Sequence, residues 1–394
     1  MNKPNRQLAI EHNQKRVHLI FKKSDTQSIL EKVMEIPSET LLKMITDAGL
    51  RGRGGAGFPT GLKWKTVREQ ESKTKFIICN ADEGEPGTFK DREILQKQAG
   101  KIIIGMTICA KVTGAKEGFI YLRSEYSYLE EALVDQINAF NKKLKKLNLD
   151  FSISLRYGSG AYICGEETAL LESMEGKRGE PRNKPPYPAT NGYLDQPTVI
   201  NNVETFVYCT LIIEHGVNTF TSLGTLGSRG SKVLCISGDA AVKGIYELEL
   251  GMTLKEFVEL FGDEGTKAVQ VGGAAGFCVP HKDFSTKIIA FEGVPTGGSM
   301  MLFSTIRSMY HVLINYLEFF VEESCGQCTP CRVGCQQLLN GLIAVKKGEK
   351  KAAYLDTLID LAETMRTTAK CGLGQSVANP FISIVESFRE EMIY

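Results

Sequence analysis

The sequence predicts an α/β protein in three parts: a domain with a largely parallel sheet, a small α+β domain and a helical C-terminal domain. In the first 220 residues, short apolar runs alternate with helical patterns, which is typical of a parallel sheet covered by helices. Between residues 221 and 299, strand patterns surround a single helix. From about residue 300 the patterns are helical only. A chain of 394 residues is long enough for several domains of this kind.

The composition and charge of the chain disfavour several classes of partner and of protein. The net charge is +1, so neither nucleic acid nor an anionic membrane surface is favoured as a partner. No segment approaches the roughly 20 apolar residues of a membrane span, and the start has no signal-peptide pattern. We therefore expect a cytoplasmic protein without a direct membrane span. In such a protein, eleven cysteines indicate reduced thiols and metal ligands rather than disulfides.

The first domain is expected at residues 38–220, after a polar N-terminal extension at residues 1–37 that packs on the outside. Its first helix has Ser38 as the N-cap and Gly49 as the stop. Three apolar runs then alternate with helical stretches such as 127–147 and are expected to form the sheet. These runs are residues 75–79, 101–110 and 118–122.

The remaining domains are expected at residues 221–299 and 300–394. In the smaller one, "KVLCISG" and "YELELG" predict strands, "TLKEFVELFG" predicts a helix capped by Thr253, and "KAVQVGG" predicts another strand. In the last one, a group of cysteines lies between two helical stretches.

A glycine-rich loop at residues 49–61 is the first candidate binding segment. It matches G-x-G-x-x-G at Gly52, Gly54 and Gly57. A dinucleotide fingerprint needs a strand before the glycines, but here a helix precedes them and Pro59 follows, so an ordinary Rossmann turn is not expected. Six glycines still let a flat or phosphorylated ligand approach the backbone, and Arg53 and Lys63 can offer positive charge. The alternative is a flexible surface loop.

Two further motifs place polar side chains after apolar strands or glycine turns. In "CNADEGEPGTFKDRE" the candidates are Asn80, Asp82, Glu83 and Glu85. Carboxylates beyond a strand end can accept hydrogen bonds from ribose or ribityl hydroxyls and repel a 2′-phosphate, which favours NAD over NADP. A solvated acidic turn and a divalent-metal loop are the alternatives. In "YGSGAYICGEETALLESMEGKRGEP", Glu166 and Glu167 begin a helix directly after a glycine-rich turn, so they are either helix-dipole partners or ligand contacts.

The cysteine run "ESCGQCTPCRVGC" contains Cys325, Cys328, Cys331 and Cys335. Its C-x2-C-x2-C-x3-C spacing is similar to a ferredoxin run, in which the fourth cysteine ligates a second cluster. No second run exists here, so the fourth ligand of a [4Fe–4S] cluster is either Cys335 or Cys371, which is followed by Gly372 and Gly374 in "AKCGLGQ". Six other cysteines are expected to be buried small hydrophobes: Cys79, Cys109, Cys164, Cys209, Cys235 and Cys278.

Taken in order with "NNVET", "ESCGQCTPCRVG" and "CGLGQ", these segments resemble the NADH-oxidising flavoprotein subunit of respiratory complex I over residues 38–394. The family includes the diaphorase subunits of NAD-linked soluble hydrogenases and formate dehydrogenases. The resemblance implies a Rossmann-like FMN domain, a β-grasp-like domain and a helical bundle with one [4Fe–4S] cluster. It also implies hydride transfer from NADH to FMN and electron delivery to partners: a thioredoxin-like [2Fe–2S] subunit and a larger iron–sulfur, hydrogenase or dehydrogenase subunit.

The resemblance also implies site residues. The FMN contacts would be Gly52, Arg53, Gly54, Gly55, Lys63, Asn80, Asp82, Glu83, Tyr162, Gly165, Glu166, Asn201 and Asn202. NADH would meet Phe58, Lys63, Glu85, Glu167 and Tyr187, with Glu85 and Glu167 as the catalytic positioning residues. The cluster ligands would be Cys325, Cys328, Cys331 and Cys371. Tyr187 and Thr66 depart from the family, which more often has Phe and an aromatic residue there, so adenine stacking is expected to be weaker.

Two alternative functions remain at this point. One places the chain in an electron-bifurcating hydrogenase or formate dehydrogenase, and the other makes it an iron–sulfur scaffold that has lost its flavin. Bound FMN and its reduction by NADH distinguish the scaffold from the enzymes.

Overall fold

The first part of the fold is built on a four-stranded parallel sheet of order β3-β2-β1-β4. The computed structural model describes residues 3–393. The strands are β1 (Phe76–Ala81), β2 (Glu117–Leu122), β3 (Ser152–Tyr157) and β4 (Thr198–Asn202). The two central strands, β1 and β2, are almost continuously buried, as expected for a parallel sheet covered on both faces. The parallel α/β prediction is therefore confirmed.

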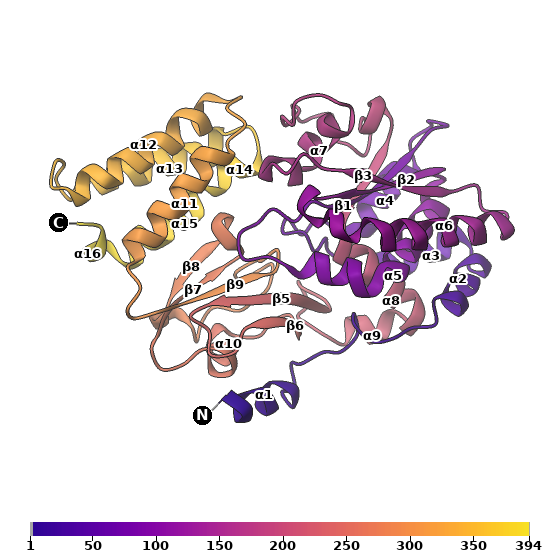
Figure 1. Cartoon of the computed structure of the whole chain (residues 1–394), viewed down its shortest axis with the longest axis horizontal. Helices are drawn as coiled ribbons and strands as arrows, with labels where there is room; N and C mark the ends of the chain where they lie inside the picture. The colour runs from indigo at the N-terminus through magenta and orange to yellow at the C-terminus, as the bar shows by residue number, and fades with distance from the viewer. Residues whose placement is uncertain (1–2, 394) are drawn as a thin grey trace.

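Helices cover this sheet on both faces (Figure 1). The helices of this part of the fold are α3 (Ser38–Asp47), α4 (Thr60–Arg68), α5 (Lys90–Thr113), α6 (Glu130–Lys146), α7 (Glu167–Met174), α8 (Val203–His215) and α9 (Val217–Thr221). The short 3₁₀ segments are η1 (Ser124–Leu129), η2 (Tyr162–Gly165) and η3 (Tyr193–Asp195).

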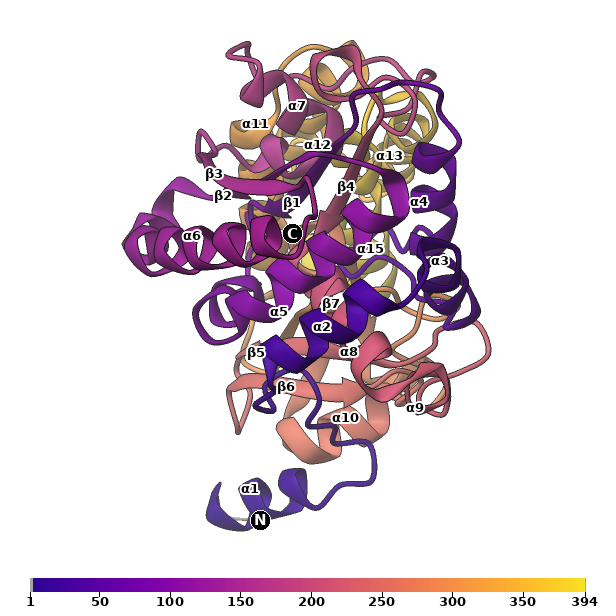
Figure 2. The same cartoon turned by 90° about the vertical axis from the view of Figure 1, so that its right-hand side faces the viewer.

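The apolar run 101–110 is not part of the sheet, which corrects the sequence prediction. It lies in α5, and all ten of its residues are buried because α5 packs against β1, α2 and α8. Figure 2 shows α2, α5 and α8 side by side. A helix covered on all sides has no polar stripe, so its sequence resembles a buried strand. Gly105 lets α5 and α8 approach closely, since a Cβ there would overlap the Phe206 carbonyl.

The N-terminal segment is more than an outer extension. Helix α1 (Lys3–Glu11) packs against α10, and α2 (Thr26–Glu35) places Leu30 and Val33 in the core beside α5. The predicted cap is also wrong: Pro37 is the N-cap of α3 and Ser38 is its first residue. The predicted stop is confirmed, since Gly49 follows the helix with a φ of 62°.

The second part is a five-stranded sheet of order β6-β5-β9-β7-β8. Its elements are β5 (Ser231–Gly238), β6 (Gly244–Glu249), α10 (Leu254–Phe261), β7 (Thr266–Val271), η4 (Gly273–Ala275), β8 (Phe277–Pro280), η5 (His281–Asp283) and β9 (Ser299–Ser304). Only β5 and β9 pair in parallel, which is a β-grasp arrangement. Thr253 caps α10 in a capping box with Glu256, as predicted. The expected limit at residue 299 is too early, because β9 belongs to this sheet.

The third part is a helical bundle, drawn in yellow and orange in Figure 1. It contains α11 (Met309–Glu323), α12 (Thr329–Lys346), α13 (Tyr354–Thr368), α14 (Gly372–Ser376), α15 (Ala378–Ser387) and α16 (Arg389–Met392). Helix α15 packs on β8, so the bundle is attached to the β-grasp sheet. Within residues 3–393, no helix combines the length and the apolar character needed to cross a membrane.

Candidate functional site

A cavity of about 490 Å³ lies beyond the carboxyl ends of β1 and β4, where ligands of open parallel sheets bind. Its volume is within the range of about 300–1,000 Å³ that is usual for cofactor pockets. The glycine loop, the acidic motif and the η2 turn line one side, the β-grasp segments 272–277 and 295–297 another, and Gly372, Leu373, Ser376 and Asn379 of the bundle a third. All three parts of the fold therefore contribute to one site.

Most of the predicted FMN contacts line this cavity. They are Gly54, Gly55, Asn80, Asp82, Glu83, Tyr162, Gly165, Glu166 and Asn202, together with Glu85 from the predicted NADH set. The lining also contains residues that the sequence motifs did not single out: Thr88, Lys90, Asp91, Pro295, Thr296, Gly297, Ser376 and Asn379. Lys90 and Asp91 lie inside the acidic motif, just after its carboxylates, so the sequence could have predicted that they line the cavity.

The glycine loop has a fixed place in the fold, which argues against a flexible surface loop. It connects α3 to α4, and the Cβ of a residue at Gly54 would lie 3.2 Å from the Cβ of Asn202. At Gly57 the φ is 65°, and a Cβ would overlap the ring of Phe291. The loop backbone therefore approaches β4 and the β-grasp domain too closely for side chains.

The side chain of Arg53 does not face the cavity, which corrects the expected phosphate contact. The residue is completely buried, and its guanidinium donates hydrogen bonds to the backbone carbonyls of Arg51 (3.0 Å), Arg229 (2.7 Å) and Ser231 (3.2 Å). Burial lowers the pKa of this guanidinium. Arg53 therefore fastens the glycine loop to the β-grasp domain.

Glu85 and Asp82, two acidic residues of the lining, differ in their hydrogen bonds. Glu85 accepts a hydrogen bond from the Tyr162 hydroxyl (2.6 Å) and another from the backbone N–H of Ala275 (3.2 Å). Burial raises the pKa of Glu85 to about 7, although these hydrogen bonds oppose the shift. Asp82 also has a pKa raised to about 7 by burial, and its Oδ2 has no hydrogen-bond partner among residues 3–393. An unpaired buried acceptor at this position fits a ligand with hydroxyl groups.

Glu83 and Glu166 have structural partners in addition to their place in the lining. Glu83 accepts hydrogen bonds from the Tyr126 hydroxyl (2.9 Å) and from the Asp91 N–H at the start of α5 (2.9 Å). Burial raises the pKa of Glu83 to about 7. Glu166 is the N-cap of α7, where it accepts from the N–H groups of Thr168 and Ala169. Its helix-terminal role is therefore confirmed, and one of its oxygens still pairs with Lys184 (2.7 Å).

Lys63 and Glu167 pair with each other and do not belong to the cavity lining. Lys63 Nζ lies 3.2 Å from Glu167 and donates to the carbonyl of Ile200 (3.0 Å), while Lys184 lies 3.0 Å from Glu167. Burial favours a higher pKa for Glu167, but the two lysines outweigh it and lower the pKa below its usual value. Glu167 is thus held as an anion.

Four other predicted contacts also lie outside the lining. Phe58 and Tyr187 are 49% and 57% exposed, so their rings are open to an incoming ligand. Asn201 is buried and accepts a hydrogen bond from the indole N–H of Trp64 (2.9 Å), which is a structural role. Gly52 donates its N–H to the carbonyl of Phe58 and thereby closes the glycine loop.

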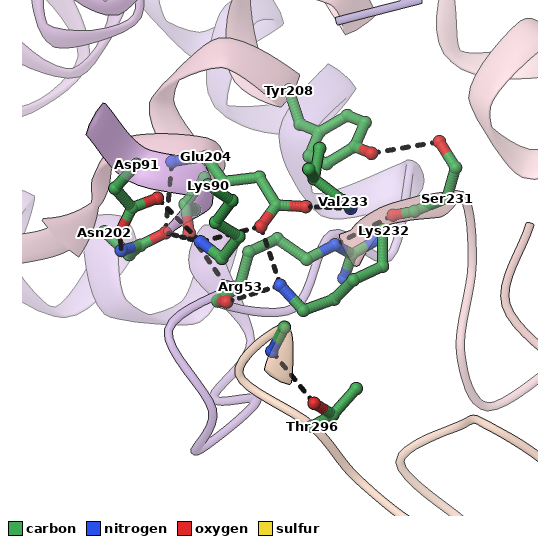
Figure 3. A network of polar contacts seen from close by, with 12 residues as sticks. Arg53, Lys90, Asp91, Asn202, Glu204, Tyr208, Ser231, Lys232, Val233 and Thr296 are labelled. Atoms are coloured by element: carbon green, nitrogen blue, oxygen red, sulfur yellow. Dashed lines mark hydrogen bonds and ion pairs between the residues drawn. The ribbon is translucent and has the colours of Figure 1, made fainter. Parts of the chain in front are cut away.

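A buried network of charges forms one wall beside the glycine loop (Figure 3). Lys90 Nζ lies 2.6 Å from Asp91 and 2.9 Å from Glu204, and Lys232 Nζ lies 2.6 Å from the same Glu204 oxygen. Asp91 also accepts a hydrogen bond from the Asn202 amide (2.6 Å). Burial lowers the pKa of Lys232 to about 8, while Asp91 and Glu204 raise that of Lys90 against the effect of its burial. The network fixes Asn202 at the edge of the cavity.

A second, smaller cavity is lined by the thiols of Cys325, Cys328, Cys331 and Cys371. Cys335 is not in its lining, and the Cys335 Sγ lies 3.9 Å from that of Cys331. In a tetrahedral zinc site the sulfurs lie about 3.8 Å apart, but no group of three or more His, Cys, Asp or Glu within residues 3–393 is placed to hold a single ion. Four cysteines line this cavity, and thiolate sulfur is the donor that iron–sulfur clusters take.

The two cavities are neighbours, because Ile163 and Leu373 line both. Of the glycines beside Cys371, only Gly374 makes a close approach: a Cβ there would lie 2.9 Å from the Cβ of Cys331. Gly372 has no described atom within 4 Å of where its Cβ would lie, so space does not require a glycine there. The six scattered cysteines are buried free thiols, as predicted.

Comparison with known proteins gives two family matches. Residues 45–210 match the Nuo51 FMN-binding domain, and residues 311–394 match the NADH-ubiquinone oxidoreductase-F iron-sulfur binding region. The chain is 41% identical to the NAD-reducing hydrogenase HoxS subunit alpha of Cupriavidus necator, covering 93% of this chain and 62% of that protein. It is 37% identical to the NADH-quinone oxidoreductase-F subunit of Aquifex aeolicus, covering 95% and 91%.

A solved structure agrees with these matches. The crystal structure of an NAD+-reducing [NiFe]-hydrogenase in the H2-reduced state superimposes with a TM-score of 0.88 at 39% identity, covering 96% of this chain and 67% of that chain. The chain thus spans less than two thirds of the HoxS relative and most of the length of the Aquifex aeolicus relative.

Proposed function

This chain belongs to the NADH-quinone oxidoreductase-F family, and we propose that it oxidises NADH with a bound FMN and delivers the electrons to a [4Fe–4S] cluster. The observation that carries the proposal is the shared wall of the two cavities, formed by Ile163 and Leu373. Because the same two residues line both cavities, the cofactor site and the cysteines are neighbours, which supports the passage of electrons between them.

The residues of the large cavity suit FMN. The backbone at Gly54 and Gly55 is free of side chains, so a planar ring or a phosphate can approach it. Asn80 and the unpaired Oδ2 of Asp82 can bind ribityl hydroxyls. FMN, when bound, supplies the conversion of a two-electron hydride transfer into single-electron steps. The surrounding residues bind and orient it and exclude water.

For NADH, the structure offers a carboxylate and two open rings. Glu85 is held at the cavity by Tyr162 and Ala275, and a 2′-phosphate beside it would meet a negative charge. We assign Glu85 the choice of NADH over NADPH. The exposed rings of Phe58 and Tyr187 are assigned to stacking against the nucleotide, and the Lys63–Glu167 pair to its polar contacts.

For the cluster, we assign the thiolates of Cys325, Cys328, Cys331 and Cys371 as ligands. The arrangement that supports this choice over Cys335 is the common cavity, whose lining includes Cys371 but not Cys335. The cysteine forty positions after Cys331 reaches the run because α14 packs against α12 and α13.

The relatives are subunits of multi-subunit complexes, and we propose the same for this chain. Its partners would be a thioredoxin-like [2Fe–2S] subunit and a larger iron–sulfur, hydrogenase or dehydrogenase subunit that receives the electrons. Affinity purification from the native source, followed by mass spectrometry of the co-purifying chains, identifies them. Purification of this chain without any iron–sulfur or dehydrogenase partner would contradict the proposal.

The activity itself is tested on the purified chain under anaerobic conditions. We expect a flavin absorbance band, about four iron atoms per chain, and bleaching of the flavin when NADH is added. A sample that retains iron but has no flavin, and that does not respond to NADH after FMN is supplied, would instead identify a flavin-free iron–sulfur scaffold.

A further inference from the structure

The fifth cysteine of this region makes a specific contact with the proposed cluster ligands. Cys331 is the third residue of α12, and Cys335 follows one helical turn later, on the same face. Their sulfurs lie 3.9 Å apart, and Cys335 is 1% exposed. The Cys331 sulfur also lies 3.2 Å from the hydroxyl oxygen of Ser324. Two side chains that can donate a proton thus converge on one sulfur of the cysteine cavity.

We propose that Cys335 donates an S–H hydrogen bond to the Cys331 thiolate and thereby raises the reduction potential of the [4Fe–4S] cluster. This inference rests on the ligand set of the proposed function. A ligating thiolate carries no proton, so in the pair of sulfurs only Cys335 can be the donor. The backbone carbonyl one turn earlier is the rival acceptor for this thiol, but the thiolate is charged and is the stronger acceptor.

Two of the other proposed ligand sulfurs have backbone groups as their neighbouring hydrogen-bond donors. Backbone N–H groups lie near two of these sulfurs, that of Gln327 beside Cys325 and those of Leu373 and Gly374 beside Cys371. Backbone donors remain when a side chain is replaced. Cys331 instead receives its hydrogen bonds from the side chains of Ser324 and Cys335, so the sequence at these two positions can tune the cluster.

The direction of the effect follows from charge. Reduction adds a negative charge to the cluster, part of which resides on the thiolate sulfurs. A hydrogen bond to a thiolate therefore stabilises the reduced state more than the oxidised state, and its loss lowers the potential. The buried position of Cys335 strengthens the contact, because no water competes with it.

The test is an EPR-monitored redox titration of the purified full-length protein, with iron content measured for every variant. We expect Cys335→Ala to retain its iron and to reduce the equilibrium constant for cluster reduction threefold. For one electron this lowers the midpoint potential by on the order of 28 mV. Cys335→Ser retains a donor of similar size, so its midpoint should stay at or above that of the wild type. Ser324→Ala should lower the midpoint as well.

Cys209→Ala is the matched control, since Cys209 is a buried thiol of α8 in the first part of the fold. It should leave the potential unchanged. Equal midpoints for wild type and Cys335→Ala, with full iron content in both, would overturn the inference while leaving the proposed function intact. Loss of the cluster in Cys335→Ala would also overturn it and would identify Cys335 as a ligand. A wild-type protein without iron would contradict the proposed function itself.

Discussion

Replacement of Lys90 by Met should strongly destabilise the first part of the fold. The Lys90 ammonium is buried between the carboxylates of Asp91 and Glu204, at 2.6 and 2.9 Å. The variant Lys90→Met keeps the apolar stem but removes the charge, so Asp91 loses its cation, whereas Glu204 still has Lys232. Removing one partner of a buried ion pair costs about 3–5 kcal/mol, because the remaining charge stays desolvated.

The matched control is Lys97→Met. Lys97 pairs with Glu93 at 2.7 Å, almost the same distance, but its side chain is 59% exposed. An exposed i, i+4 pair contributes about 0.3–0.5 kcal/mol. Both lysines lie in α5 and lose the same group, so burial is the main difference between them. The free energy of unfolding should therefore fall about ten times more in the first variant than in the second.

Urea unfolding followed by tryptophan fluorescence measures this difference. Trp64 is the single tryptophan of the chain and is fully buried in α4, which packs on α5. The double variant Lys90→Met with Asp91→Asn should recover part of the loss, because it removes the orphaned charge as well. If Lys90→Met cost no more than Lys97→Met, the network would not be an electrostatic support of the cavity wall.

Three further outcomes test the site. The ratio of kcat/KM for NADH to kcat/KM for NADPH should exceed one and should increase from pH 6 to pH 8, because burial raises the pKa of Glu85 to about 7 and its carboxyl becomes an anion above that pH. The variant Glu85→Gln should abolish this increase. Equal kcat/KM values for the two nucleotides would contradict the role of Glu85. Gly54→Val should give folded protein with little FMN by absorbance after gel filtration, since its Cβ would crowd Asn202; near-normal flavin content would indicate a free loop. Cys371→Ser should abolish or convert the EPR signal of the reduced cluster, whereas Cys335→Ser should leave the signal present, and the reverse result would exchange their roles.

The sequence was informative wherever short segments carry their own signal. The capping box at Thr253 and the stop at Gly49 depend on neighbouring residues, and both appear as predicted. The acidic motif follows β1, so its carboxylates had to lie at the carboxyl end of a strand. Local backbone chemistry is enough to determine features of this kind.

Predictions from short segments were wrong where the tertiary packing around a segment determines its structure. The run 101–110 is apolar on every side, and only its packing between β1 and α8 makes it a helix. Arg53 was expected to meet a phosphate because of its charge, and the family resemblance also implied that it contacts FMN. The structure turns its guanidinium toward the carbonyls of Arg229 and Ser231, which come from a later part of the chain.

The cysteines show the same division. Their spacing determined that three thiols share one cavity and that two candidates exist for the fourth position, because C-x2-C-x2-C places its members within a few residues. The spacing alone left both candidates open and the family resemblance implied Cys371, whereas the tertiary structure supplies the physical reason: the packing of α14 against α12 brings Cys371 into the cavity, while the helical turn from Cys331 to Cys335 places the latter behind its neighbour. Contacts between segments forty residues apart depend on the packing of whole helices, and no local pattern in the sequence specifies that packing.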